Sequence, residues 1–312
     1  MDTSLVVETY NFGEAQGRSE LPGAIMAGLR AIAAHPDREL LVVDPCGAPG
    51  VEALLEGNPR ARRVSSEADS YDTAKAHAAA AATGRFVVYI DGDCTPVNED
   101  WVERLLAPLR AGECIAAGGI TYYPGGTVQA ACSVLDFGFL LDGLESGELG
   151  CYASNNVAFD REALEAHPVP PGPLRCRCFA HAQLLERIGA PVRLVRDAVV
   201  EHAPTLFFKE RLRRGSDLVG ACWVDPNLPE ARWLRHGVAA APIFYYQNLR
   251  LDWRRAGRAR RFFGWSPAKA AAVTVLLPIF RLVDLVGIAS ALLRGPQAAR
   301  GSSAPPGPPA RS

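Results

Sequence analysis

Residues 85–93 of the chain read RFVVYIDGD, an apolar run that ends in two aspartates separated by one glycine. An almost continuously apolar run of this length is typical of a central strand that is buried on both faces. Asp91 and Asp93 then lie at the carboxyl end of that strand, the edge of an open α/β sheet where ligands bind. This stretch therefore predicts an α/β fold and the place of a site.

The segments around this run alternate between strand and helix patterns with short connections, which indicates a mostly parallel, Rossmann-like sheet with helices on both faces. We expect this domain to span residues 1–204. Before the run, strands are expected at 4–9, 39–44 and 63–64, and helices at 21–32, 50–56 and 73–82. After it, helices are expected at 101–109 and 182–188, and strands near 114–119, 155–160, 192–195 and 198–201.

The composition changes from about residue 205 to a helical, arginine-rich pattern that continues to residue 294. Residues 270–293 are strongly apolar but contain Pro278, Arg281 and Asp284. A membrane span would place the two charges in hydrocarbon at about 2.5 to 3.5 kcal/mol each, so an in-plane or re-entrant helix on an anionic membrane is expected instead. The alternative is a core helix packed on the catalytic domain. Residues 295–312 are rich in Gly, Pro, Ala and Ser, and a disordered tail is expected there.

Charge and cysteine usage exclude several classes of protein. The 33 basic and 34 acidic residues give a formal net charge of -1, which argues against a nucleic-acid binder that works by overall positive charge. Eight cysteines in 312 residues are too few for a secreted disulfide scaffold. The first residues show no signal-peptide pattern, so a cytoplasmic protein is expected. A dehydrogenase is disfavoured because no G-x-G-x-x-G follows the first strand.

Asp91, Gly92 and Asp93 suit a divalent cation. Hard cations such as Mg²⁺ or Mn²⁺ prefer carboxylate oxygens and often complete their coordination with substrate phosphates, and Gly92 allows the backbone to approach a ligand. The alternative is a surface turn, because Asp-Gly pairs are common in turns. The buried strand before these residues favours a metal and nucleotide site.

The order and spacing of six motifs resemble those of the family 2 glycosyltransferases, which are inverting enzymes of GT-A fold. The resemblance covers roughly residues 4–215. It implies a metal-assisted transfer of sugar from a nucleoside-diphosphate sugar to a hydroxyl of a glycan or lipid-linked acceptor, and no nucleic-acid partner. The motifs are VVETYN at 6–11, LVVD at 41–44, the helix over 73–82 that ends at Gly84, VYIDGDCTP at 88–96, NNVAFDREAL at 155–164 and AVVEH at 198–202.

The resemblance also assigns roles to single residues. Asp44 would accept a hydrogen bond from the base, unless it caps a helix, and Lys75 would lie near the nucleotide, unless it is a solvated helix residue. Asp93 would be the direct metal ligand. His202 would be the second ligand, although a lone histidine is otherwise usually structural. The nucleotide-binding residues would be Glu8, Thr9, Tyr10, Asp44, Lys75, Asp91 and Gly92.

Basic residues just after His202 could stabilise the negative charge that grows on the leaving diphosphate. Arg213 and Arg214 are the expected catalytic cations, with Lys209 and Arg211 beside them on a closing loop. The alternative for each is a solvated helix face.

One departure from the family pattern concerns the general base. The family has a Glu-Asp pair before a Leu-x-x-Arg stretch, and alignment on Leu184 and Arg187 places Ala180 and His181 there. His181 could act as the base near neutral pH, or a carboxylate from the middle of the chain could do so. Otherwise His181 only lines the helix start. A catalytically inactive nucleotide-sugar-binding or scaffold protein is therefore the alternative to a glycosyltransferase of bacterial cell-surface polysaccharide or glycolipid synthesis.

Overall fold

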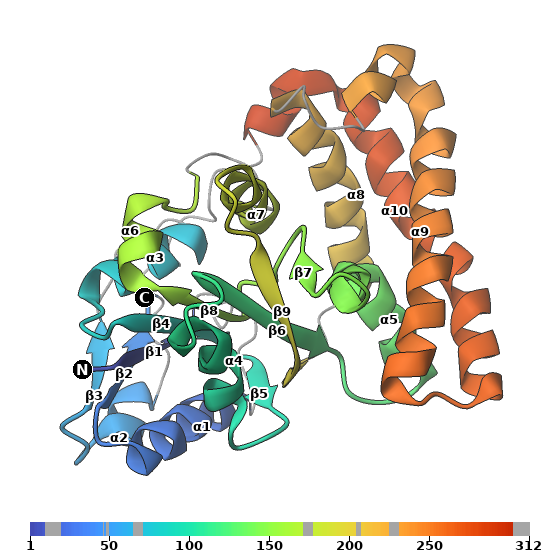
Figure 1. The fold of residues 1–312 in the computed structure, drawn as a ribbon. Helices are drawn as coiled ribbons and strands as arrows, with labels where there is room; N and C mark the ends of the chain where they lie inside the picture. Colours follow the sequence, from blue (N-terminus) through green and yellow to red (C-terminus); the bar gives the residue numbers. More distant parts are fainter. Residues whose placement is uncertain are drawn as a thin grey trace. The chain divides into compact units, whose positions relative to one another are not determined.

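The computed structural model describes residues 1–9, 20–45, 47, 50–64, 71–170, 177–203, 207–224 and 231–301, in two compact units (Figure 1). The first unit comprises Met1–Pro124, Phe139–Pro170 and Cys178–Ala203. The second comprises Gly125–Gly138, Pro171–Arg177 and Pro204–Ser312. The step from Ala203 to Pro204 lies beside the boundary expected at 204/205, and residues 125–138 from the middle of the chain group with the second unit.

The first unit contains one sheet, in which the described strands follow the order β3-β2-β1-β4-β8-β6-β9-β5, and β7 pairs with β9. The order is not sequential, because helical crossovers connect the parallel strands. The strands are β1 (Thr3–Glu8), β2 (Arg38–Val43), β3 (Ala61–Val64), β4 (Phe86–Asp91), β5 (Cys94–Pro96), β6 (Ala116–Tyr122), β7 (Glu148–Leu149), β8 (Asn156–Asp160) and β9 (Val192–His202).

The α/β architecture is confirmed, and parallel pairing occurs throughout the N-terminal half of the sheet and again between β6 and β9. Strands β3, β2, β1 and β4 are parallel. Strand β8 then pairs antiparallel with both β4 and β6, and β5 and β7 pair antiparallel with β9. The sheet is therefore mixed, because strand β8 (residues 156–160) lies between β4 and β6 in the sheet and runs antiparallel to both.

The two strands predicted at 192–195 and 198–201 form the single strand β9. Its pairing with β6 shifts register between Gly118 and Ile120, so that Gly118 lies opposite Leu194 and Ile120 opposite Val199. The polar pair Arg196-Asp197, which interrupts the apolar pattern, falls within this irregularity. The sequence therefore suggested a break where the strand only bulges.

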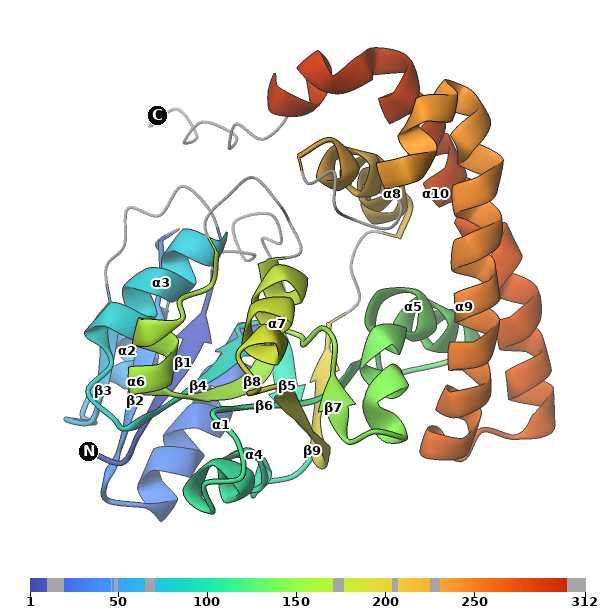
Figure 2. The same cartoon turned by 45° about the horizontal axis from the view of Figure 1, so that its top comes forward.

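Helices cover both faces of the sheet, as expected (Figures 1 and 2). One face is covered by α1 and α4, whose apolar side chains pack on β1, β2 and β4 in one core. Trp101, Leu105, Leu106 and Leu109 form the buried stripe that the sequence predicted for α4. The helices of this unit are α1 (Glu20–Ala34), α2 (Val51–Leu55), α3 (Tyr71–Ala81), α4 (Trp101–Arg110), α6 (Arg161–Ala166) and α7 (Arg177–Arg187), with the 3-10 helix η2 (Gly138–Leu144).

The second unit is helical, as the sequence indicated. Helices α9 and α10 form a hairpin whose turn begins at Gly264, where φ is 63°. Trp253 Nε1 donates to the carbonyl of Thr274 at 3.4 Å, and Tyr245 Oη donates to that of Pro278 at 3.2 Å. The elements are α5 (Thr127–Phe137), α8 (Phe207–Val224), the 3-10 helix η3 (Ala231–Ala239), α9 (Ala240–Phe263) and α10 (Pro267–Gly301).

The expected tail at 295–312 begins at a break in α10. Gly295 has φ 72° and ψ 176°, which interrupts the helix. The chain is helical again after Gly295, as far as Gly301. Residues 302–312 lie outside the described part of the chain.

Buried ion pairs connect α9 and α10. Arg281 binds Asp252 through Nε and Nη2, at 2.6 and 2.9 Å, and its Nη1 binds Asp284 at 2.7 Å. Burial by itself lowers the pKa of Arg281, but its hydrogen bonds and charge pairing with Asp252 outweigh that and raise it. The two charged residues within the apolar segment, Arg281 and Asp284, therefore bind the neighbouring helix.

Arg211 of α8 extends this ion-pair network. It is 2% exposed, pairs with Asp136 of α5, and lies 3.7 Å from Asp284. Its guanidinium is thus enclosed by carboxylates, and this contradicts the suggestion that Arg211 belongs to the cations of a closing loop.

We predict that Arg281→Met lowers the free energy of unfolding by about 3–5 kcal/mol, because Asp252 is fully buried and would lose its main counter-charge. Urea unfolding of the full chain followed by tryptophan fluorescence measures this. Arg104→Met is the control, because its pair with Asp100 lies on the surface and such pairs contribute less than about 1 kcal/mol. Equal losses for the two variants would contradict the role of the network.

Candidate functional site

Polar side chains gather where β1, β2 and β4 end. Glu8 lies in register with Val43 of β2 and with Asp91 of β4, so the three strands end side by side. Thr9 follows β1, and its hydroxyl donates to Asp44 Oδ1 at 2.7 Å. Glu8, Thr9, Asp44 and Asp91 are all buried. The structure thus brings these four predicted residues to one edge, while Tyr10 lies outside the described residues.

Asp44 is held from two sides. Its Oδ1 accepts from Thr9, and its Oδ2 lies 3.1 Å from Nη2 of Arg63. The alternative role as a helix cap is not seen at α2, where Gly50 is the N-cap. Arg63 was not predicted as a site residue. Its position near the end of the predicted third strand could have indicated that it lies at the same edge of the sheet.

Lys75 is a buried member of the same cluster. Its Nζ lies 2.8 Å from Asp91 Oδ1, donates to the Ser154 carbonyl, and lies 5.4 Å from the ring centroid of Tyr89. The alternative of a solvated helix residue is therefore wrong. Lys75 neutralises Asp91, which reduces the cost of burying that carboxylate.

Asp93 and His202 come together because β5 pairs antiparallel with β9, with Cys94 opposite His202. His202 Nδ1 donates to the carbonyl of Ala203 at 2.7 Å, since a carbonyl can only accept. In the neutral imidazole the lone pair is then on Nε2, which lies 3.7 Å from Asp93 Oδ1. The ring of Tyr123 packs edge-on against His202 at 5.4 Å. A carboxylate oxygen and an imidazole lone pair at this separation fit a divalent cation.

Cys94 adds a third candidate ligand atom that the sequence analysis did not consider. Ligand atoms of Asp93, Cys94 and His202 all lie within 4.8 Å of one another. Burial and the nearby carboxylates of Asp93 and Asp91 raise the pKa of the Cys94 thiol. Because a metal binds the thiolate, the protonated thiol is the weakest of the three donors.

His181 is fully buried in α7. Its Nε2 donates to the carbonyl of His167 at 2.8 Å, so Nδ1 accepts from the hydroxyl of Tyr152 at 2.7 Å. Burial lowers its pKa, partly offset by the bond to the His167 carbonyl. With both ring nitrogens occupied, the geometry favours the alternative in which this histidine lines the helix.

Arg213 and Arg214 lie on α8 in the second unit. Arg214 Nη1 is 3.4 Å from Asp136 Oδ1, so this cation takes part in the ion-pair network of that unit. The side chain of Lys209 lies outside the described residues. A role of Arg213 and Arg214 toward a diphosphate stays a prediction.

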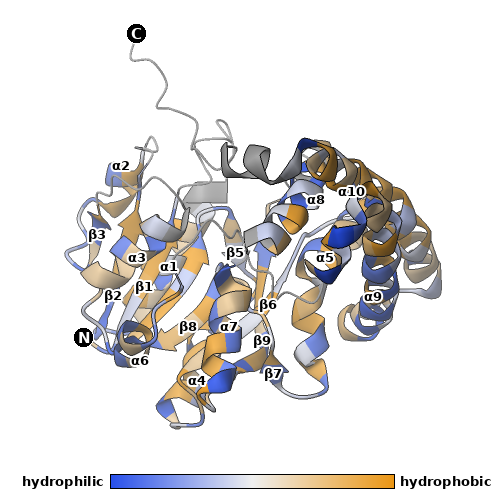
Figure 3. Cartoon of the chain, turned by 90° about the horizontal axis from the view of Figure 1, so that it is seen from above, coloured by the Kyte–Doolittle hydropathy of each residue, from blue (hydrophilic) through white to orange (hydrophobic). Residues whose placement is uncertain are grey.

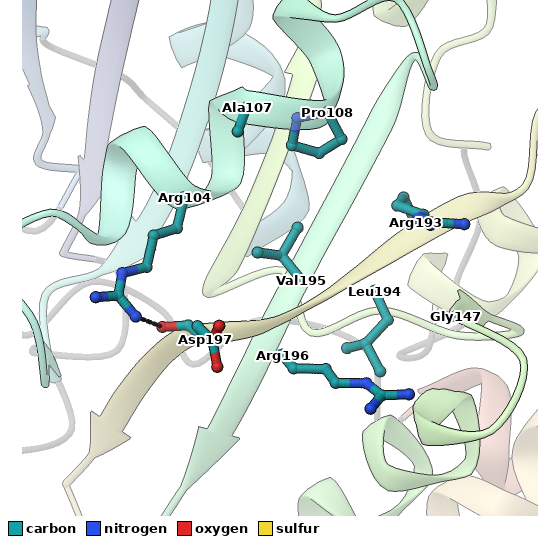
Figure 4. A pocket seen from close by; sticks show the side chains of 9 residues that line it. All are labelled: Arg104, Ala107, Pro108, Gly147, Arg193, Leu194, Val195, Arg196 and Asp197. Atoms are coloured by element: carbon teal, nitrogen blue, oxygen red, sulfur yellow. Dashed lines mark hydrogen bonds between the residues drawn. The ribbon is translucent and has the colours of Figure 1, made fainter.

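A separate cavity of about 710 Å³ lies in the first unit beside α4 and the first half of β9 (Figure 4). Arg104 Nη1 donates to the Asp197 carbonyl at its rim, at 3.3 Å. The cavity contains none of the predicted site residues. Its lining consists of Arg104, Ala107, Pro108, Gly147, Arg193, Leu194, Val195, Arg196 and Asp197.

Comparison with solved structures defines the class of fold. The mannosyltransferase PcManGT from Pyrobaculum calidifontis, solved with GDP-mannose and Mn²⁺, is similar with a TM-score of 0.56 and 18% identity, over 96% of this chain and 86% of that one. Glucosyl-3-phosphoglycerate synthase from Mycobacterium tuberculosis, solved with Mn²⁺, UDP and glucosyl-3-phosphoglycerate, gives a TM-score of 0.49 and 22% identity, over 70% and 78%. The similarity to PcManGT shows that the chain has the GT-A fold.

The family follows from the sequence. The model of glycosyl transferase family 2 matches residues 4–167, which is more than half of the chain, and the chain belongs to this family. No curated protein matches it. The resemblance read from the six motifs is confirmed, and the protein is a glycosyltransferase.

We predict that His181 contributes a pH-dependent part of the stability. Its folded-state pKa lies below the ordinary value of 6.5, so the unfolded chain takes up a proton first as the pH falls. The free energy of unfolding should be full above about pH 6.5 and decrease as the pH falls through the folded-state pKa.

Urea unfolding at pH 7.5 and at pH 5 measures this slope, and His181→Gln should reduce it. His77→Gln, at an exposed histidine, is the matched control and should leave the slope unchanged. An identical slope in His181→Gln would show that His181 is not held neutral by its burial.

Proposed function

We propose that this glycosyltransferase moves a sugar from a nucleoside-diphosphate donor to an acceptor hydroxyl, with Mg²⁺ or Mn²⁺ held by Asp93 and His202. The observation that carries the proposal is the approach of His202 Nε2 to Asp93 Oδ1 at 3.7 Å, while the other ring nitrogen, Nδ1, donates to the carbonyl of Ala203. When bound, such a cation stabilises the negative charge on a leaving diphosphate.

The protein residues around this pair suit a nucleotide. Glu8, Thr9, Asp44 and Asp91 lie at neighbouring strand ends, and Asp44 has a carboxylate that can accept from a base. Ligands in open α/β sheets bind outside the carboxyl ends of the strands. Lys75 pairs with Asp91, which reduces the negative charge that an anionic diphosphate would meet at this edge.

The neighbour PcManGT supports a nucleotide sugar and a divalent cation as ligands, because it was solved with GDP-mannose and Mn²⁺. We extend only the ligand class to this chain. The donor base and sugar are to be found by screening.

The start of α7, where the family has its general base, does not supply one in this chain. Ala180 has no titratable group, and His181 is enclosed by Tyr152 and the His167 carbonyl. An active enzyme then takes its base from outside the start of α7. The enclosure of His181 is also what favours the second candidate function, a protein of this family that binds a nucleotide sugar without transferring it.

We further propose a cytoplasmic protein attached to the inner face of the membrane through residues 231–293, acting in cell-surface polysaccharide or glycolipid synthesis on a glycan or lipid-linked acceptor. Two segments of the described chain are long and apolar enough to cross a membrane, Thr127–Leu144 and Pro267–Gly295. Only 28% of the second is buried, against 61% of the first, so the second is the one that supports attachment.

We predict that Asp93→Asn weakens nucleoside-diphosphate binding in Mn²⁺ by roughly tenfold or more, because it removes a carboxylate ligand. Isothermal calorimetry with GDP and UDP, with Mn²⁺ and with EDTA, measures this. Asp100→Asn, at an exposed aspartate, is the control and should bind as wild type does. Equal affinity of Asp93→Asn and wild type in Mn²⁺ would refute the assignment.

Release of free nucleoside diphosphate tests the transfer itself. Wild type with its donor, Mn²⁺ and a soluble glycan acceptor should release nucleoside diphosphate faster than without acceptor. Metal-dependent donor binding without any acceptor-stimulated release, across a panel of donors and acceptors, would favour the non-transferring protein instead.

A further inference from the structure

Helix α10 carries an exposed apolar stripe. Val275, Ile279, Leu282, Val286 and Leu293 are between 50% and 74% exposed. At 100° per residue these five side chains fall within an arc of about 60°, and the stripe is about 27 Å long. Figure 3 shows α10 as mostly hydrophobic. Single exposed apolar residues are ordinary, but an aligned series on one helix face marks an interaction surface.

The opposite side of α10 is buried within its own unit. Asp284 and Ile288 are 3% exposed, and Leu277 is fully buried. Asp284 lies about 180° around the helix from Val275. Because Asp284 and Arg281 are tied to α9 through Asp252, the rotation of α10 is fixed with its apolar stripe outward.

Helix α9 carries a row of exposed arginines. Arg250, Arg254 and Arg261 are exposed and fall within an arc of about 40°. Trp253 and Tyr246, 44% and 62% exposed, lie between this row and the contact with α10, where the Trp253 indole donates to Thr274. Starting from the α9–α10 contact, the arginine row on α9 and the apolar stripe on α10 are both reached by turning around the helix in the direction of increasing residue number. Because the two helices run antiparallel, these two turns lead to the same side of the hairpin.

We infer that this side of the α9–α10 hairpin, called the hairpin face from here on, binds an anionic lipid surface. The apolar stripe would enter the acyl-chain boundary, the aromatic rings would lie at headgroup depth, and the arginine row would bind phosphates. The inference rests on the proposed membrane attachment of residues 231–293 and assigns it to one face.

Charge decides between lipid and a second copy of the chain. The acids of α9 and of α10 in the described chain are Asp252 and Asp284, and both are buried against Arg281. The hairpin face therefore offers no exposed carboxylate to the arginine row of another copy, whereas anionic headgroups supply that charge.

Flotation of the full chain with vesicles tests the inference. Vesicles of phosphatidylglycerol and of phosphatidylcholine are compared at low salt. Wild type should float with the anionic vesicles, and Ile279→Glu with Val286→Glu should lower its vesicle affinity by more than about tenfold. Arg250→Glu with Arg254→Glu should lower it by roughly fivefold or more for each reversed charge.

Matched controls change the same kinds of residue on the first unit. Val97→Glu with Ile188→Glu replaces two apolar residues that are 49% and 45% exposed, and Arg30→Glu reverses an exposed arginine of α1. These variants should float as wild type does. Where the first stripe variant perturbs folding, as seen by circular dichroism, Val275→Glu with Leu282→Glu repeats the test.

The possible outcomes distinguish the hairpin face from membrane attachment in general and from self-association. Stripe variants that float like wild type would overturn the hairpin face while membrane attachment stands. Wild type that stays unbound to anionic vesicles would overturn both. A dimer in sedimentation analysis that the stripe variants dissociate, without vesicle binding, would assign the face to self-association. Nucleoside-diphosphate release with a soluble acceptor is measured without vesicles, so it reports on sugar transfer independently.

Discussion

Strands β1, β2 and β4 are buried along their whole length, and the position of the candidate nucleotide site depends on this burial. Apolar side chains fill both faces of these strands in their middle and C-terminal parts, so the polar groups that can meet a ligand come where each strand ends. Glu8, Asp44 and Asp91 stand at these ends. Because their carboxylates are buried, each needs a counter-group, as Arg63 provides for Asp44 and Lys75 for Asp91.

The metal-binding candidates depend on a different part of the sheet. Strand β9 bulges opposite Gly118 and Ile120 and continues to His202, which pairs with Cys94 beside Asp93. The two candidate ligands are separated by more than a hundred residues in the chain, and an antiparallel pairing brings them together. The contact of Ala203 with His202 Nδ1 then orients the ring.

The second unit follows the same rule that buried charges are paired, but with a different result. Asp136, Arg211, Asp284, Arg281 and Asp252 form ion pairs with one another within the helical unit. Helix α10 therefore buries Asp284 on the same side as Leu277 and Ile288, and exposes a second row of apolar residues on its other side. Such an arrangement is unusual for a protein that meets only water, and it supports an apolar or lipid partner.

Periodicity and motif order in the sequence determined the family, the α/β class, most helices and strands, and the strand-end positions of Glu8, Asp44, Asp91 and Asp93. The local sequence is sufficient to predict these features, because the alternation of apolar and polar residues and the ends of strands depend on residues that are neighbours in the chain. Tertiary structure alone decided the antiparallel return of β8, the bulge that joins 192–202 into one strand, and the partners of Lys75, Arg211, Arg281 and His181. These depend on which distant segments share an interior, where a charge or an imidazole must find a partner that no spacing along the chain reveals.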